Sequence, residues 1–193
     1  GNVFRYADLD STVSFFAKEA VMLAHGKALK DVRGYLTGKC VRILLAYRRH
    51  CASSTSPGQL ILPESFKLLP LYMLALIKNK AIKGGNVTSD VRVFFMQLLQ
   101  RLSVGATLVL LYPRMIALHT LADADGFPVA ETQTGQGPDG QVASYELMKR
   151  IQCPRTVRPS YQRMDPHGAY LLENGEWCLL WLGAQVSPKL LED

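Results

Sequence analysis

The sequence predicts an α+β protein, with a mainly α-helical bundle domain over residues 1–114 and a smaller sheet module over residues 115–193. Three observations lead to this fold class. Apolar residues recur at helical spacing through most of the first domain, and short polar or glycine-containing segments separate these runs. Near the end of the chain the pattern changes to a strand hairpin. Helical runs with short connections favour an antiparallel bundle.

Two amphipathic helices are expected at the start of the chain, over residues 9–25 and 28–51. Asp8 or Asp10 can cap the first one, because a carboxylate accepts hydrogen bonds from the free N–H groups of the first turn. Gly26 provides a stop. We therefore interpret the two aspartates as caps and not as a catalytic carboxylate pair.

The stretch over residues 59–83 is expected to form a central helix around which the first domain is organised. Residues 68–77 contain no charged or amide side chain, and a helix that is apolar on all sides must be surrounded by other elements. Pro63 suits a helix start, and Pro70 predicts a kink or a restart because it cannot donate a backbone hydrogen bond. The apolar run is shorter than the ~20 residues that span a bilayer.

Local signals also set the limits of this helix and of the two that follow. Gly84 and Gly85 are expected to end it, with Leu71 and Leu74 in its core. The cap of the next helix is expected among Thr88, Ser89 and Asp90. Its expected apolar face consists of Val91, Phe94, Phe95, Leu98 and Leu102. A last apolar helix is predicted over residues 103–112, before Pro113.

The sheet module is expected to begin with a short strand over residues 115–121 and to end with a hairpin. Two aromatic strands, over residues 169–172 and 176–182, flank an Asn174-Gly175 pair, which is a strong turn signal. A helix is predicted to start at Ser187-Pro188, where serine suits the cap and proline the first turn.

A glycine-rich segment over residues 123–144 has almost no large apolar side chains, and we interpret it as an inserted surface loop. Its glycines match the dinucleotide-binding pattern at Gly135, Gly137 and Gly140. That pattern binds pyrophosphate only between a strand and a helix of a βαβ unit, which is not predicted around it. A short helix is expected over residues 144–151.

No catalytic motif is found in the sequence, which predicts a protein that is not an enzyme. It has no Gly-x-Ser-x-Gly elbow, P-loop or His-Glu-x-x-His motif. His119 is interpreted as structural, and Trp177 and Trp181 would share one strand face for packing. The four cysteines form no Cys-x-x-Cys pair, so no zinc site is expected.

Positive charge is concentrated on the first third of the chain, which carries +5 of the total net charge of +6. On the expected helix over residues 28–51, apolar residues fall in one arc at about 100° per residue, and basic residues fall on the opposite side. These candidate membrane- or partner-facing residues are Lys27, Lys30, Arg42, Arg48 and Arg49. Such a stripe suits anionic lipid, nucleic acid or an acidic protein surface, and an ordinary solvated face has the same pattern.

Several long segments resemble one protein family. AYRRHCA, LILPESFKLLPLYMLALIKNKAI and LLYPRMIALHTL resemble the helical region of the cargo-adaptor subunit of the COPII vesicle coat. RPSYQRM and GAYLLENGEWCLLWLGAQVSPKLL resemble the gelsolin-like module of that subunit. These segments are collinear with the family and cover most of residues 4–121 and 154–191. The resemblance implies that residues 115–193 form part of a gelsolin-like domain.

The resemblance also implies a function. The chain would be a non-enzymatic fragment of a cytoplasmic coat subunit, peripheral on the membrane of endoplasmic reticulum exit sites and on COPII vesicles. Its partners would be the GTPase-activating sister subunit of the inner coat, the tails of cargo proteins and the anionic membrane surface. The family's zinc site would lie before Gly1, so no cofactor is expected here.

The alternative function is a basic helical module that binds nucleic acid. It is disfavoured because the basic stripe has no interleaved exposed aromatic residues on which bases could stack. Nucleic acid is therefore not an expected partner.

Overall fold

The chain folds into two compact units, each with its own apolar core. The structure is a computed structural model and describes residues 2–51, 62–128 and 151–192. One unit comprises residues 1–113 with 174–176, and the other comprises residues 114–173 with 177–193. Helices in the first and an antiparallel sheet in the second confirm the predicted α+β class.

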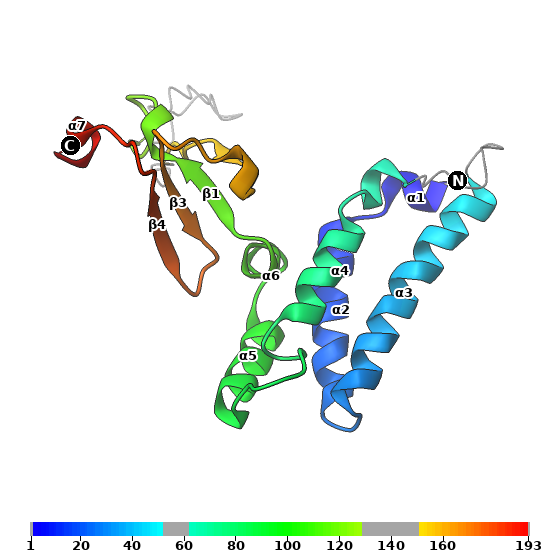
Figure 1. Ribbon diagram of the computed structural model, residues 1–193. Helices are drawn as coiled ribbons and strands as arrows, with labels where there is room; N and C mark the ends of the chain where they lie inside the picture. The colour runs from blue at the N-terminus through cyan, green and yellow to red at the C-terminus, as the bar shows by residue number, and fades with distance from the viewer. Residues whose placement is uncertain (1, 52–61, 129–150, 193) are drawn as a thin grey trace, which may run out of the picture. The chain divides into compact units, whose positions relative to one another are not determined.

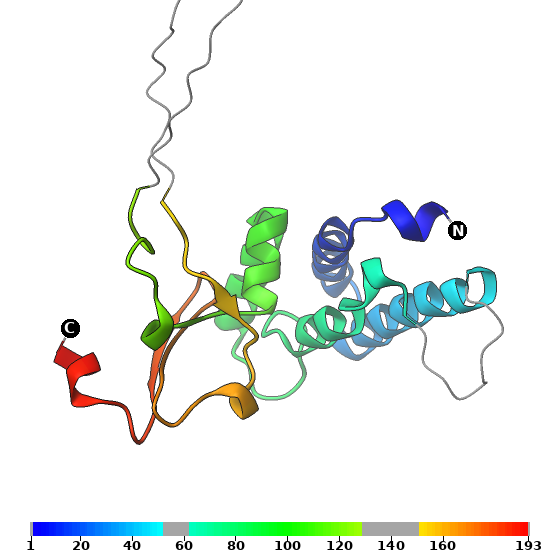
Figure 2. The ribbon, with the colours of Figure 1, turned by 90° about the horizontal axis from the view of Figure 1, so that it is seen from above.

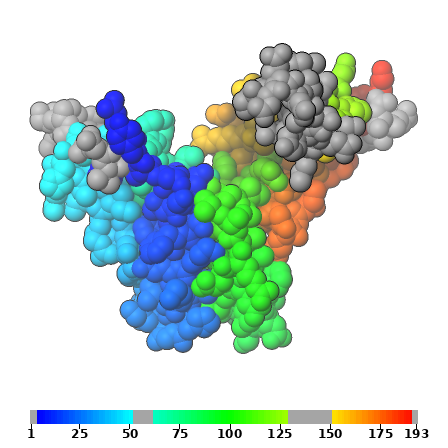
Figure 3. Space-filling view, turned by 180° about the vertical axis from the view of Figure 1, so that it is seen from behind, coloured from blue at the N-terminus to red at the C-terminus, as the bar shows by residue number. Residues whose placement is uncertain are grey.

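The first unit consists of helices (Figure 1). These are α1 (Asn2–Tyr6), α2 (Leu9–Ala24), α3 (Leu29–His50), the 3-10 helix η1 (Glu64–Phe66), α4 (Leu69–Lys78), α5 (Ser89–Arg101) and α6 (Val104–Leu111). Helix α2 contacts α3, α4, α5 and α6, and Figure 3 shows it in blue between α3 and the green segments. The predicted centre over residues 59–83 is therefore wrong, because α2 is the helix on which the others pack.

The sequence of α2 explains its central position. The Asp8 carboxylate, one of the two predicted alternatives, caps the helix by accepting the backbone N–H groups of Asp10 and Ser11 at 3.2 and 3.1 Å. Its buried stripe includes Ala17 and Ala20, whose small side chains allow neighbouring helices to approach closely. Larger apolar residues of the same stripe fill the space between helices: Val13, Phe16 and Val21.

A lysine ties α2 to the end of α5. The Nζ group of Lys18 donates to the carbonyl oxygens of Leu99, Gln100 and Leu102, at 3.2, 2.8 and 3.0 Å. These carbonyls belong to the last turn of α5 and to its C-cap residue Leu102. The last carbonyl groups of a helix have no N–H partner within the helix. A cation there also complements the negative end of the helix dipole.

Replacing Lys18 by methionine is therefore expected to destabilise the helical unit by about 1–3 kcal/mol, the usual cost of losing hydrogen bonds to a charged group. The methionine keeps much of the apolar stem and removes the donor. Urea denaturation followed by circular dichroism measures the loss. Lys30→Met is the control, since Lys30 is exposed on α3. Equal stability of the two variants would contradict this role of Lys18.

Helix α4 is shorter than predicted. It restarts at Leu69 with Pro70 in its first turn, as the proline predicted, but it ends at Lys78 and not at Gly84 and Gly85. Asn79 ends it, because its side-chain oxygen accepts the N–H of Ala81 at 2.9 Å and so stabilises a turn.

The predicted core of α4 is also wrong. Leu69 and Leu76 are fully buried, while Leu74 is 49% exposed and Leu71 is only half-buried. Leu74 and Leu76 lie two residues apart, about 200° around the helix, so they cannot face the same core.

Helix α5 is capped by Thr88, whose hydroxyl accepts the N–H of Val91 as one of the predicted alternatives. Its apolar face differs from the predicted one: Phe95, Met96 and Leu99 are buried, whereas Phe94 is 52% exposed. The contacts of Arg92 explain why this side of α5 is the buried one. Its guanidinium donates to the carbonyl oxygens of Lys80, Ala81 and Lys83, which turns the Arg92 side of α5 toward the protein.

The second unit is a four-stranded antiparallel sheet in the order β2-β1-β3-β4 (Figures 1 and 2). Its elements are β1 (Arg114–Ala117), η2 (Leu118–Thr120), β2 (Thr156–Val157), η3 (Tyr161–Arg163), β3 (Ala169–Glu173), β4 (Cys178–Leu182) and α7 (Pro188–Glu192). Met115, Ala117 and Tyr170 form the buried core of this sheet.

The hairpin of β3 and β4 confirms the predicted Asn-Gly turn. Gly175 has a φ of +80°, a backbone conformation that glycine adopts without steric cost. Trp177 lies in the turn, so it does not share a strand face with Trp181 as predicted. Trp181 packs against Tyr170, with ring centroids 5.7 Å apart. His119 lies in η2, because the strand predicted over residues 115–121 ends at Ala117.

The glycine-rich segment is described only as far as Pro128. In the described part of this segment, the N–H of Gly126 donates to the carbonyl oxygen of Gln152 at 2.8 Å. The N–H of Gln152 donates to the carbonyl oxygen of Phe127 at 2.9 Å. Ile151 forms a bridge with Pro128, so it is not the end of a helix. The pattern at Gly135, Gly137 and Gly140 and the rest of the helix predicted over residues 144–151 lie outside the described residues.

Candidate functional site

The five residues of the predicted basic stripe are all exposed and lie on or beside α3. We call them the basic face: Lys27, Lys30, Arg42, Arg48 and Arg49. Lys27 precedes the N-cap residue Ala28, so it lies in the turn before α3 and not on the helix as predicted. Within the described segments, no ion pair is recorded for Lys27, Lys30, Arg42 or Arg49. These exposed side chains present positive charge at the surface of the helical unit.

The basic face also presents two aliphatic side chains that the charge pattern alone did not reveal. Val41 is 56% exposed and Leu45 is 39% exposed. At about 100° per residue, Leu45 falls between Lys30 on one side and Arg42 on the other. A helical projection of the sequence would have found both. Positive charges around exposed aliphatic groups are typical of helices that lie against an anionic lipid surface.

Lys39 is basic but does not belong to this face. Its Nζ lies 3.6 Å from an oxygen of Glu19 and 5.1 Å from the ring centroid of Tyr35. The Tyr35 hydroxyl donates to the same Glu19 oxygen at 2.7 Å. A hydrogen bond with Tyr35 and then the charge of Glu19 raise the pKa of Lys39. This cluster joins α2 to α3. The basic face lies on the side of α3 away from α2.

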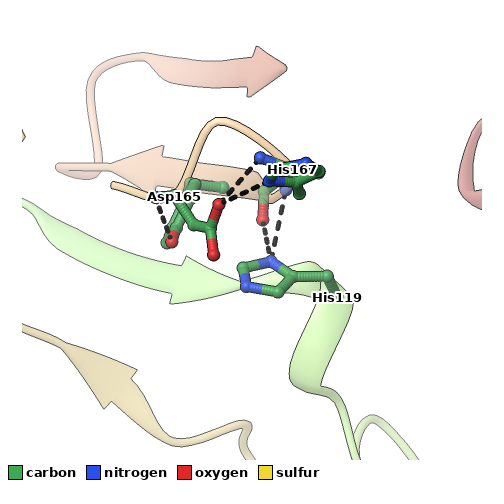
Figure 4. A network of polar contacts seen from close by, with 5 residues as sticks. His119, Asp165 and His167 are labelled. Atoms are coloured by element: carbon green, nitrogen blue, oxygen red, sulfur yellow. Dashed lines mark hydrogen bonds and ion pairs between the residues drawn. The ribbon is translucent and has the colours of Figure 1, made fainter. Parts of the chain in front are cut away.

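The histidines of the sheet unit belong to a network of polar contacts before β3 (Figure 4). Nδ1 of His119 lies 3.1 and 3.2 Å from the carbonyl oxygen and the nitrogen of Ala169. Asp165 accepts the backbone N–H and Nδ1 of His167 at 2.9 and 3.2 Å. The backbone N–H of His167 and then its side chain lower the pKa of Asp165. Both histidines therefore hold the turn before β3.

No helix within the described ranges is both long and apolar enough to span a membrane. The described residues also contain no cluster of three or more His, Cys, Asp or Glu side chains able to hold a metal ion. The role of the basic face as a membrane- or partner-facing surface stays a prediction.

Comparison with known proteins identifies the family. A model of the Sec23/Sec24 helical domain matches residues 8–109. Protein transport protein SEC24 C of Arabidopsis thaliana is 37% identical over 191 residues, which are 99% of this chain and 16% of that protein. Human protein transport protein Sec24C is 33% identical over 192 residues, 99% of this chain and 15% of that protein.

A solved structure agrees with these relatives. The crystal structure of the human COPII-coat protein Sec24c superposes with a TM-score of 0.73 at 33% identity, over 98% of this chain and 21% of that chain. This chain thus spans between about a sixth and a fifth of the length of the curated relatives it matches. Since the family model covers more than half of its residues, the chain belongs to the Sec23/Sec24 helical domain family.

Proposed function

We propose that this chain is the helical and adjoining sheet part of a COPII cargo-adaptor subunit that acts in transport from the endoplasmic reticulum to the Golgi. One observation carries the proposal: similarity to Sec24 proteins extends through both units, over 99% of the chain. A likeness limited to the helices would have supported only a shared bundle. The nucleic-acid-binding alternative has gained no supporting observation.

The proposed role is scaffolding and recognition, with no chemical reaction and no cofactor in this stretch. The partners are the GTPase-activating sister subunit of the inner coat and the tails of cargo proteins. The subunit would be a peripheral protein of the cytosolic side of exit-site membranes and of COPII vesicles. The sheet unit is proposed to be part of a gelsolin-like domain.

A chimaeric subunit tests this function. The matching stretch of human Sec24C would be replaced by this chain, and release of coated vesicles from microsomes would be measured with the purified partner subunits. Vesicle release close to that of unmodified Sec24C is expected. A chimaera that folds but releases no vesicles would contradict the proposal.

The basic face is proposed to lie against the anionic cytosolic leaflet. Each basic residue near such a surface contributes on the order of 1 kcal/mol. Arg42 and Arg49 are exposed on the side of α3 away from the buried Leu36, so reversing their charge leaves the core untouched. Screening at physiological salt limits the reach of each charge to about 8 Å. Binding through this face must therefore be sensitive to salt.

Replacing Arg42 and Arg49 by glutamate is expected to weaken binding to liposomes that contain phosphatidylserine by about tenfold or more. The difference from the unmodified chain should shrink as salt rises. Co-sedimentation with liposomes measures both effects. Lys67→Glu with Lys78→Glu is the matched control, because it changes the net charge equally at two other exposed positions. Equal losses in the two double variants would mean that only total charge matters, which would refute a role specific to the basic face.

A further inference from the structure

The sheet unit contains a hollow of about 520 Å³ between β2 and the end of β1 with the residues that follow it. Three arginines line it: Arg155 and Arg158, which directly precede and follow β2, and Arg163 of η3. Sequence analysis missed this site, although the segment from Cys153 to Met164 contains three arginines and no acid.

The positive charge of this hollow is not neutralised within the described part of the chain. Its three arginines are exposed, and their guanidinium groups form no ion pair or hydrogen bond with another described residue. Asp125 also lines the hollow, but both oxygens of its carboxylate are already hydrogen-bonded. One accepts the N–H of Ala122 at 2.9 Å, and the other accepts the side-chain amide of Gln152 at 3.2 Å. Three positive charges therefore stand against one negative charge.

This excess of charge favours a phosphomonoester over a carboxylate as the ligand. A carboxylate offers two oxygens and a single negative charge. A phosphomonoester offers three acceptor oxygens and carries a charge of about −1.5 to −2 at pH 7. Guanidinium groups match the geometry of phosphate with paired N–H donors. One phosphomonoester thus balances the charge of the hollow, which would otherwise require two carboxylates.

The hollow also has room for the organic part of such an ester. Its volume lies within the range of about 300–1,000 Å³ that is usual for small-molecule sites. Ala117 and Val157 contribute apolar wall, and Thr156 contributes an exposed hydroxyl. The hydroxyl of Thr120 donates to the carbonyl oxygen of Ala117 at 3.1 Å and can still accept a hydrogen bond. A wall of this mixed character suits a hydroxylated carbon skeleton, which inorganic phosphate lacks.

We propose that this hollow binds a small phosphomonoester, whose phosphate lies against Arg155, Arg158 and Arg163 and whose organic part lies against the mixed wall. A soluble sugar phosphate and the headgroup of a phosphorylated lipid present this same dianionic group. The site is separate from the basic face on α3. It follows from the charge and volume of the hollow, whether or not the chain acts in a vesicle coat.

Isothermal titration calorimetry of the 193-residue chain with glucose 6-phosphate tests this site. Replacing Arg158 and Arg163 by glutamine is expected to weaken binding about tenfold or more, since each change removes a hydrogen-bonded charge pair. The matched control is Arg42→Gln with Arg49→Gln, which removes the same charge on α3 and should change the affinity less than about twofold. Glucose should not bind, and inorganic phosphate should bind more weakly than the ester. Tryptophan fluorescence verifies that the sheet unit of each variant is folded, because both tryptophans lie in it.

Vesicles distinguish the two sources of the ester. Phosphatidylcholine vesicles would contain either phosphatidylinositol 4-phosphate, which carries a phosphomonoester, or phosphatidylserine at the same surface charge, which carries only a phosphodiester. If the Arg158 and Arg163 variant loses co-sedimentation with the first vesicles alone, the ligand is a lipid headgroup. If that variant loses only the binding of glucose 6-phosphate, the ligand is a soluble ester.

Four results would overturn the proposal. The first is that neither glucose 6-phosphate nor the phosphatidylinositol 4-phosphate vesicles bind the unmodified chain. The second is undiminished binding of both probes to the folded Arg158 and Arg163 variant. The third is an equal loss in the two double variants, which would show that binding depends only on overall charge. The fourth is binding of inorganic phosphate or of a polyglutamate peptide as tightly as glucose 6-phosphate at the same ionic strength, which would show that the arginines attract any anion.

Discussion

Replacing Leu76 by alanine should lower the free energy of unfolding of the helical unit by about 2–5 kcal/mol, the range measured for leucines in protein cores. Leu76 is fully buried on α4 and belongs to the same core as Leu36, Leu69 and Leu99. Alanine at this position leaves a cavity that packed helices cannot fully close, and the lost contacts add to the lost hydrophobic burial. Urea denaturation followed by far-ultraviolet circular dichroism, to which the helices contribute most, measures the loss.

Leu74→Ala is the matched control for this cavity. It removes the same atoms from the same helix, but Leu74 is 49% exposed. A surface substitution of this kind usually changes stability by less than about 0.5 kcal/mol, and alanine has the higher helix propensity. Equal losses in the two variants would show that Leu74 is buried as well, as the sequence predicted. That result would contradict the orientation of α4 described above.

Gly183→Ala should destabilise the sheet unit by about 3 kcal/mol, at the upper end of the usual cost of overpacking. A Cβ on Gly183 would overlap the carbonyl group of Pro166 and would lie 3.0 Å from the carbonyl oxygen of Gly168. Neither neighbour can move freely. The Pro166 oxygen accepts the N–H of Gln185, and the Gly168 oxygen accepts the N–H of Gly183, both at 2.9 Å. The added methyl group must therefore break backbone hydrogen bonds or displace the turn before β3.

Tryptophan fluorescence during urea denaturation isolates this effect, because both tryptophans of the chain, Trp177 and Trp181, lie in the sheet unit. Gly34→Ala is the control. Apart from the backbone of its own helix, no atom of the described residues lies within 4 Å of its added Cβ, and an alanine inside a helix is favoured over glycine by about 0.5–1 kcal/mol. The control should therefore leave the tryptophan transition unchanged and stabilise the helices slightly. An unchanged tryptophan transition for Gly183→Ala would disprove the close approach of Pro166.

Local signals in the sequence determined the elements themselves. Asp8 and Thr88 cap helices, and each is one of the predicted alternatives, since a cap requires only a side-chain oxygen within three residues of free N–H groups. Pro70 marks a helix restart, and Gly175 permits the hairpin turn that joins β3 and β4. Each of these features depends on neighbours in sequence, so no knowledge of the rest of the fold is needed to predict it.

Only the tertiary structure decided which sides of these elements are buried. The sequence of α4 is apolar all around, so its pattern cannot distinguish Leu74 from Leu76, and contacts with α2, α3 and α6 make the choice. The rotation of α5 depends on Arg92, which donates to carbonyls about ten residues earlier.

The two basic sites also differ in whether the sequence alone predicts them. The basic face is visible in the sequence because one helix carries nearly all of it, at a regular spacing. The hollow lined by Arg155, Arg158 and Arg163 is not, because it requires the end of β1, the strand β2 and η3 to meet. Between β1 and β2 lie almost forty residues of chain, and antiparallel pairing brings Ile116 opposite Thr156. Hydrogen bonds between distant strands decide such a site, and no local pattern encodes them.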